Sequence, residues 1–245
     1  MKKLDIVITM AGEGSRFKKA GYQVPKYMIE VHGKTLFEWS MLSLKGYQDI
    51  VDHYIFVVRG IDFPAEFIGH ECEKLGILKH EVIEIDYLTD GQATTALLAK
   101  NAWTPNHGLL IYNIDTYVEA FNMNDKELKG DGFIPCFKGQ GDHWSFVRLD
   151  DGGRAEEVRE KVRISDYCTL GAYYFKSCQL YQELYEEYYS SDENLEKGEK
   201  YVAPLYNYLI RSKNGSVYIS VVEQEKIHVL GTPEELDVFK SSYQG

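Results

Sequence analysis

Residues 5–31 constrain the fold of this 245-residue chain more than any other part of its sequence. The stretch begins with an apolar run at residues 6–8, typical of a buried β-strand, and continues into a turn of small residues at 11–15. Glycines in such a turn let the backbone approach a ligand, and free N–H groups ahead of a helix attract anions. We therefore expect a strand, an anion-binding turn and the start of a helix in succession.

Two cations accompany the turn. Arg16 offers a planar fork that suits phosphate, and Lys26 offers a mobile point charge that Pro25 helps to aim by fixing the backbone. An ordinary strand–helix turn would explain the glycines alone, but the string A-G-x-G-S-R-F, followed nine residues later by P-K, is more specific. It favours a nucleoside triphosphate site. A P-loop lysine would follow the second glycine directly, and a dinucleotide turn would have a third glycine in place of Phe17.

The composition excludes several classes of function. Hydrophobic residues make up 44% of the chain, which is ample for a core. A formal net charge of −11 argues against nucleic acid or an anionic membrane as a partner, because both attract basic surfaces. No apolar run is long enough for a signal peptide or a membrane span, so we expect a cytoplasmic protein. Free thiols in a reducing compartment are expected at the four widely spaced cysteines, Cys72, Cys136, Cys168 and Cys178.

Strand-like and helix-like segments alternate along the first half of the chain. The predicted strands cover residues 6–8, 27–31, 52–59, 81–87 and 109–114. The predicted helices cover residues 35–44, 63–78 and 94–101. This alternation predicts βαβ units, a mostly parallel sheet, and ligands at the carboxyl ends of the strands.

The second half of the chain has a less regular pattern. Its predicted strands cover residues 132–137, 144–149, 169–175 and 217–222. Its predicted helices cover residues 177–190, 202–211 and a last segment from 231, with Thr232 as the cap and Pro233 at the first position. No linker or repeat separates the halves. We therefore expect one Rossmann-like α/β domain over residues 1–245, a three-layer αβα arrangement with a mixed, mostly parallel sheet.

Two further segments carry residues suited to a nucleotide. Gly91 would let a nucleobase lie against the backbone, and Gln92 offers a donor and an acceptor for a base edge, although residues 89–96 fit an ordinary helix N-terminus equally well. Asp115 follows the strand at 109–114. An aspartate there is usually a turn residue, but it also suits Mg²⁺, which prefers one or two carboxylates with phosphate oxygens.

Together these motifs resemble the sugar-phosphate nucleotidyltransferases, a family with a GT-A-like fold and the signature of a first strand, G-x-G-[ST]-R and a downstream P-K. The resemblance covers nearly the whole chain and is strongest in its first third. It implies that residues 1–130 bind a nucleoside triphosphate and residues 131–245 bind the acceptor. It also implies catalytic roles for Arg16, Lys26 and Asp115, with Asp115 as the Mg²⁺ ligand. The implied nucleotide-binding residues are Met10, Ala11, Gly12, Glu13, Gly14, Ser15, Arg16, Lys26, Gly91, Gln92, Thr94 and Asn113.

The family also carries E-K and then G-x-Y-x-F, which here correspond to Glu160, Lys161 and Gly171. Without the resemblance, the charged run at 156–163 would be interpreted as a solvated surface. The resemblance implies that Glu160 accepts hydrogen bonds from hydroxyl or amine groups of the acceptor. It implies that Lys161 binds the acceptor phosphate.

One position departs from the family pattern. Members commonly carry a second metal-binding aspartate two residues before the late G-T, where this chain has Val229. A hydrophobic side chain cannot ligate Mg²⁺, so the second metal position is left open. Its neighbour His228 suits a substrate contact, but a lone histidine on a strand is more often structural.

The compact form of the chain and residues 199–210 resemble a capsule-locus subgroup that includes a phosphoglutamine cytidylyltransferase. The resemblance implies transfer of NMP from an NTP, with CTP favoured, to a phosphorylated sugar or small molecule such as phosphoglutamine, with release of pyrophosphate. Two alternatives remain. One is a GT-A glycosyltransferase, which would use Asp-x-Asp where this chain has Asn113-Ile114-Asp115. The other is a non-catalytic nucleotide-binding regulator. The sequence leaves open whether the chain forms oligomers.

Overall fold

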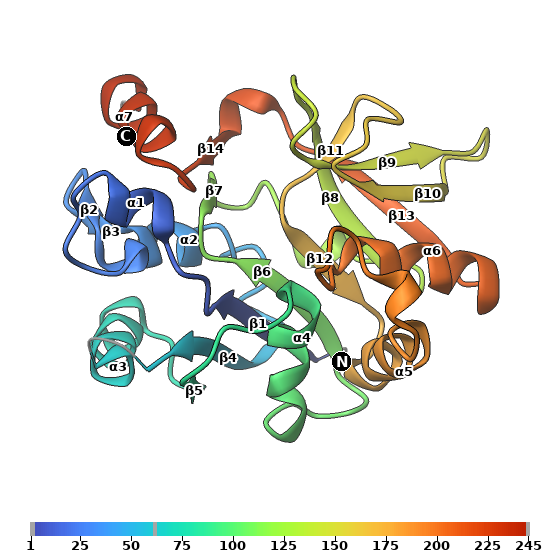
Figure 1. Ribbon diagram of the computed structural model, residues 1–245, viewed down its shortest axis with the longest axis horizontal. Coiled ribbons are helices and arrows are strands. Elements are labelled where there is room, and N and C mark those ends of the chain that lie inside the picture. The colour runs from blue at the N-terminus through green and yellow to red at the C-terminus, as the bar shows by residue number, and fades with distance from the viewer. Residues whose placement is uncertain (1–2, 61–62, 244–245) are drawn as a thin grey trace.

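Four parallel strands form one end of the ten-stranded sheet in the computed structural model, which describes residues 3–60 and 63–243 (Figure 1). In sheet order they are β5 (His80–Ile85), β4 (Val51–Arg59), β1 (Leu4–Met10) and β6 (Gly108–Asn113). Successive residues of β1 face opposite sides, because Val7 packs in one core cluster and Ile6 and Ile8 pack in another. Both faces of β1 are therefore covered, as a three-layer arrangement requires.

Helices cover both faces of these strands. On the side of Ile6 and Ile8 lie α2 (Leu36–Leu42) and α3 (Pro64–Leu75). On the side of Val7 lie α4 (Gln92–Leu97), its 3₁₀ extension η2 (Leu98–Asn101), α5 (Cys178–Tyr188) and α6 (Ala203–Ser212). The helices predicted from periodicity are all present, with ends shifted by a few residues.

Mostly antiparallel strands extend the sheet in the second half of the chain. They are β12 (Ala172–Phe175) beside β6, then β8 (Gly132–Lys138), β11 (Tyr167–Thr169), β9 (Ser145–Leu149) and β10 (Ala155–Glu160), with β13 (Val217–Val221) parallel to β8. The ten-stranded sheet is mixed with a parallel core, which confirms the predicted single α/β domain. Strand β10 is not among the predicted strands, because its charged residues mask the pattern. Even so, Glu157 and Val158 are buried.

Short elements surround the sheet. They are α1 (Ser15–Lys19), the hairpin of β2 (Glu30–Val31) and β3 (Lys34–Thr35), the pair of β7 (Thr116–Val118) and β14 (Ile227–Val229), and the 3₁₀ turns η1 (Lys26–Met28), η3 (Asp125–Glu127), η4 (Asp192–Asn194) and η5 (Gln224–Lys226). The strand predicted at 27–31 is therefore wrong in its first half. The N–H of Met28 donates to the carbonyl of Pro25 at 2.9 Å, which closes a tight turn instead.

Helix α7 (Pro233–Ser242) returns the end of the chain to the first third of the fold (Figure 1). Its cap is as predicted, with the Thr232 hydroxyl accepting the N–H of Glu235 at 3.1 Å and Pro233 at the first position. Its buried face joins Phe17 in a third core cluster. The preceding segment lies against the site, because the N–H of Leu230 donates to the carbonyl of Asp115 at 2.8 Å.

The four cysteines are buried free thiols, as predicted. None of the helices in the described part of the chain combines the length and the apolar character needed to cross a membrane.

Candidate active site

The glycine turn connects β1 to a helix of five residues. Gly14 has a φ of +62°, a left-handed conformation that glycine adopts without strain, and it precedes the first residue of α1. The side chain of Phe17 is buried in the cluster that α7 shares, so it anchors the short helix. The turn therefore has the exposed backbone that the sequence predicts, and the buried side chain of Phe17 anchors it to the core.

Lys26 and Asp115 meet beside this turn. Lys26 Nζ lies 2.7 Å from Asp115 Oδ2, although the residues are 89 positions apart. Burial would raise the pKa of Asp115, but the ammonium of Lys26 and the guanidinium of Arg16 hold that pKa below its ordinary value. The carboxylate therefore stays ionised, and it is still 29% exposed.

A cavity of about 470 Å³ opens at the carboxyl ends of β1 and β6. Eight of the predicted nucleotide and metal residues line it, namely Met10, Ala11, Gly12, Lys26, Gly91, Gln92, Asn113 and Asp115. We refer to it as the nucleotide cavity. A second space of about 320 Å³ shares Met10, Gly12 and Lys26 with it and is lined by Glu13, Gly14 and Arg59. Ser15 and Arg16 are exposed at the start of α1 and line neither space.

The predicted nucleotide residue Thr94 is not brought to the cavity. Its hydroxyl contacts Asp90 and lies 2.7 Å from the hydroxyl of Tyr185 on α5. Thr95, one position later, lines the cavity instead. Consecutive residues of a helix point about 100° apart, so a one-residue difference decides which threonine faces the cavity.

Gly91 has a different neighbour from the nucleobase expected from the sequence. Its φ is +143°, and a Cβ there would overlap the backbone of Lys200. The N–H of Ala93 donates to the carbonyl of Lys200 at 3.0 Å, and the N–H of Lys200 donates to the carbonyl of Asp90 at 2.7 Å. Gly91 therefore lets a distant loop dock on the start of α4.

A third cavity of about 260 Å³ lies over the antiparallel strands and is called the acceptor cavity below. Glu160 and Gly171, two of the predicted acceptor-binding residues, line it. Its aromatic lining residues are Phe137, His143, Trp144, Tyr173 and Tyr201. Glu160 is fixed by the hydroxyl of Ser145, which donates to its Oε2.

Lys161 lies at the edge of the acceptor cavity rather than in its lining. Its Nζ donates to the hydroxyl of Tyr201 at 2.9 Å and lies 3.5 Å from Glu160. Partial burial would lower the pKa of Lys161, but Tyr201 and Glu160 raise it above its ordinary value, so the ammonium stays charged.

The nucleotide and acceptor cavities meet at Gln92, Asn113 and Glu199, which line both. Gly171 leaves room for the Asn113 side chain, because a Cβ on Gly171 would overlap the amide of Asn113. The Oδ1 atom of Asn113 is buried with no hydrogen-bond partner in the described part of the chain. This oxygen can therefore accept a hydrogen bond from a ligand bound where the two cavities meet.

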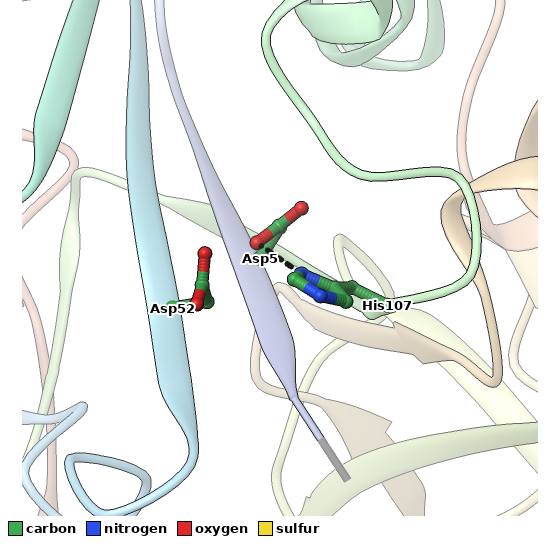
Figure 2. A group of neighbouring side chains, drawn as sticks. All are labelled: Asp5, Asp52 and His107. Carbon is green, nitrogen blue, oxygen red and sulfur yellow. Dashed lines mark hydrogen bonds and ion pairs between the residues drawn. The ribbon is translucent and has the colours of Figure 1, made fainter.

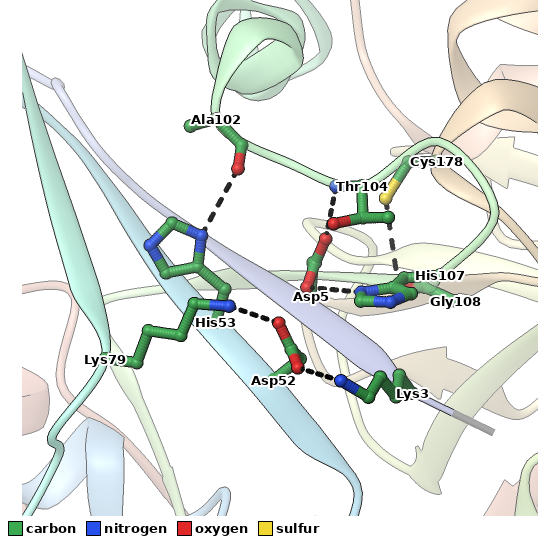
Figure 3. A network of polar contacts seen from close by, with 10 residues as sticks. All are labelled: Lys3, Asp5, Asp52, His53, Lys79, Ala102, Thr104, His107, Gly108 and Cys178. Carbon is green, nitrogen blue, oxygen red and sulfur yellow. Dashed lines mark hydrogen bonds and ion pairs between the residues drawn. The ribbon is translucent and has the colours of Figure 1, made fainter. Parts of the chain in front are cut away.

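Asp115 fits a divalent cation, because it is an ionised carboxylate that is partly exposed to the nucleotide cavity. A second acidic group, Asp5, Asp52 and His107, lies at the opposite edge of the sheet, where β1, β4 and β6 begin (Figure 2). Asp5 accepts the backbone N–H of Thr104 at 2.6 Å and contacts Nδ1 of His107 at 3.0 Å. Asp52 is held between Lys3 and Lys79 (Figure 3). The carboxylates of Asp5 and Asp52 thus already have cationic or N–H partners, and the three residues lie away from the nucleotide cavity.

Arg59 and Glu199 are among the site residues that were not predicted. Arg59 is the last residue of β4, and its Nε is buried without a partner among the described residues. Its position at the carboxyl end of a predicted parallel strand was the available signal. Glu199 comes from a polar loop, and nothing local in the sequence distinguishes it.

No protein-family model and no curated protein matches the sequence. Solved structures do match. An inositol-1-phosphate CTP transferase from T. maritima has a TM-score of 0.77 at 14% identity over 96% of this chain and 92% of that chain, a likeness in fold alone. A nucleoside-diphosphate-sugar pyrophosphorylase from Vibrio cholerae RC9 has a TM-score of 0.89 at 36% identity over 97% of this chain and 100% of that chain. At that identity, over nearly the full length of both chains, this chain belongs to the nucleoside-diphosphate-sugar pyrophosphorylase family of nucleotidyltransferases.

Proposed function

We propose that this protein transfers a nucleotidyl group from a nucleoside triphosphate, with CTP favoured, to a phosphorylated sugar or small molecule such as phosphoglutamine. The products are a nucleotide-linked compound and pyrophosphate, made in the bacterial cytoplasm for capsule or surface-polysaccharide synthesis. The observation that carries the proposal is the meeting of two cavities at Gln92, Asn113 and Glu199. One cavity offers the backbone turn and cation that a triphosphate needs, and the other offers a separate polar pocket for an acceptor.

In this reaction an oxygen of the acceptor phosphate attacks the α-phosphorus in line. The bond from phosphorus to the bridging oxygen breaks, and pyrophosphate leaves with its electron pair. Lys26 stabilises the negative charge that develops at the α-phosphate, while Arg16 and the glycine turn bind the leaving pyrophosphate. A phosphate dianion is already nucleophilic, so positioning and charge neutralisation by these residues suffice.

A Mg²⁺ ion, when bound, neutralises negative charge on the triphosphate. In this chain the carboxylate of Asp115 would hold it from the floor of the nucleotide cavity. Lys26 Nζ lies 2.7 Å from Asp115 Oδ2, so its ammonium and a cation held by Asp115 would both neutralise phosphate charge.

The preference for CTP is supported by the amide of Gln92. Its Nε2 donates to the hydroxyl of Thr9 at 3.1 Å, and its Oε1 accepts no hydrogen bond from any residue that the structure describes. That oxygen is an acceptor suited to the exocyclic amine of cytosine, whereas uracil and thymine carry a carbonyl at the same place.

The acceptor proposal rests on Glu160, Lys161 and Gly171. Glu160 accepts hydrogen bonds from hydroxyl or amine groups inside the acceptor cavity. Lys161 binds the acceptor phosphate from the edge of that cavity, where Tyr201 now holds its ammonium. Residues 1–130 thus serve the nucleotide and residues 131–245 mainly the acceptor.

A pyrophosphate-release screen tests the proposal. The four NTPs are paired with sugar 1-phosphates, choline phosphate and phosphorylated amino-acid derivatives, with and without Mg²⁺. We expect release with CTP and one acceptor class, and none from Asp115→Asn. Transfer from a nucleotide sugar without pyrophosphate would indicate a glycosyltransferase instead. Tight NTP binding without turnover would indicate a regulator, and either result would contradict the proposal.

A further inference from the structure

Gly231 opens a small space beside Asp115. A Cβ at Gly231 would lie 3.3 Å from Asp115 Oδ2 and 3.4 Å from Glu235 Oε2. The absence of a side chain at Gly231 therefore leaves two carboxylate oxygens, from β6's carboxyl end and from α7, facing one shared space. The two acids are 120 positions apart in the sequence, and only the return of α7 brings them together.

Glu235 is turned toward this space without any protein partner there. Its Oε2 is buried and has no hydrogen bond among the described residues. It is the third residue of α7, where a glutamate commonly reaches back to the N–H of the cap residue. In α2, Glu38 does so with Thr35, but in α7 only the bond from the N–H of Glu235 to Thr232 forms.

The charges around the space are suited to a cation bound with a polyphosphate. Lys26 pairs with Asp115, and no ion pair involves Glu235 in the described part of the chain. A buried carboxylate oxygen with no donor is costly unless a ligand satisfies it. Val229, the position at which relatives were expected to carry a second acid, is two residues before Gly231 and supplies no oxygen.

We propose that Glu235 is the second carboxylate that holds the divalent cation at this site, together with Asp115, across the space left by Gly231. Mg²⁺ keeps several of its waters and takes one or two carboxylates along with phosphate oxygens, which matches this set of donors. The acid missing at position 229 is thereby supplied from the first turn of α7. The inference rests on the proposed nucleotidyl transfer for its biological role, but not for its geometry.

Mn²⁺ binding tests the proposal without reference to turnover. Mn²⁺ is titrated into the full-length protein, alone and with CTP, and free Mn²⁺ is followed by electron paramagnetic resonance. We expect Glu235→Gln to weaken Mn²⁺ binding at least about tenfold, because loss of even an indirect partner of a metal commonly costs that much. Asp115→Asn should weaken it similarly. The cap bond of α7 runs from the backbone N–H of residue 235 to Thr232 and does not need the glutamate side chain, so the fold should be kept.

The matched control is Glu234→Gln, which removes the same charge from the neighbouring, exposed position of α7 and should leave Mn²⁺ binding unchanged. Gly231→Ala keeps every charge but fills the space, and it should also weaken binding. Normal Mn²⁺ affinity in Glu235→Gln would remove Glu235 from the cation site, and no Mn²⁺ binding by the wild type would overturn the site. Glu235-dependent binding in a protein that releases no pyrophosphate would leave the cation site standing and refute the proposed function.

Discussion

At the scale of single residues, one ion pair sets the electrostatics of the site. Lys26 and Asp115 balance each other in the free protein, and both remain partly exposed to the nucleotide cavity. The low pKa of Asp115 keeps its carboxylate ionised, and therefore able to hold a cation, below its ordinary titration range. A bound triphosphate can thus pair with Lys26, and a bound cation can pair with Asp115, without moving either side chain far.

Lys26→Ala should lower turnover about 10²–10³-fold, because a charge that stabilises the transition state is worth about 3 kcal/mol. Asp115 is 29% exposed, so water can solvate its unpaired carboxylate and the melting temperature should change little. Steady-state kinetics and thermal unfolding followed by circular dichroism measure the two effects. Lys19→Ala, at an exposed position of the same segment, is the control and should behave as the wild type. Near-normal turnover of Lys26→Ala at saturating substrates would remove Lys26 from the mechanism.

At the scale of elements, the loop at residues 191–201 completes both cavities. It docks on the start of α4 through backbone bonds from Lys200 to Asp90 and Ala93, which flank Gly91. It docks on the end of α5 through the hydroxyl of Tyr189, which donates to the carbonyl of Tyr201 at 2.6 Å. Glu199 of this loop lines both cavities and Tyr201 lines one. The position of the loop therefore affects nucleotide and acceptor alike.

Gly91→Ala should raise the KM of both substrates about tenfold. A Cβ at φ +143° is strained and overlaps the backbone of Lys200, at a cost of about 1–3 kcal/mol that displacement of the loop would relieve. Steady-state kinetics in each substrate checks this. Gly69→Ala in α3 is the control, because a Cβ there meets nothing within 4 Å, and it should leave both KM values unchanged. Unaltered KM values in Gly91→Ala would show that the loop does not form the site.

At the scale of the whole molecule, the two ends of the parallel strands have different roles. The carboxyl ends of β1 and β6 border the nucleotide cavity, whereas the Asp5–His107 and Lys3–Asp52–Lys79 contacts lie where β1, β4 and β6 begin (Figure 3). The return of α7 then brings the end of the chain beside Asp115, where the N–H of Leu230 donates to the carbonyl of Asp115. Its packing includes His228, whose ring stacks on Tyr117 with centroids 5.3 Å apart.

The stability of the protein should fall below about pH 6.5 partly through His228. Burial lowers the pKa of His228 below its ordinary value of 6.5, more than the neighbouring Glu119 raises it. The unfolded chain therefore binds a proton at a higher pH than the folded chain, so acidification through the unfolded pKa favours unfolding. Urea unfolding of the wild type and His228→Gln between pH 5 and 8 measures this. The variant should lose less of its stability between pH 7 and 5. Identical slopes in the two proteins would exclude His228 as the cause.

The predictable parts of the site are those set by neighbouring residues. The glycine turn, the cap of α7 and the aspartate after β6 can each be recognised from neighbouring residues, and each lies where the sequence predicts. The orientation of Thr94 was not predictable, because it depends on which helix face α5 covers. The partner of Gly91 was not predictable either, because Lys200 is 109 positions away.

The sequence by itself determined the strand–turn–helix start, the alternation that forms a parallel core, and the residue types suited to a nucleotide. Hydrophobic periodicity and turn chemistry act over a few residues, so a single sequence reveals them directly. Only the tertiary structure decided that Lys26 meets Asp115 and that Glu199 lines both cavities. The same holds for the approach of Glu235 and Asp115 to the space beside Gly231. These contacts join residues from distant segments, and they depend on the packing of whole elements rather than on any local preference.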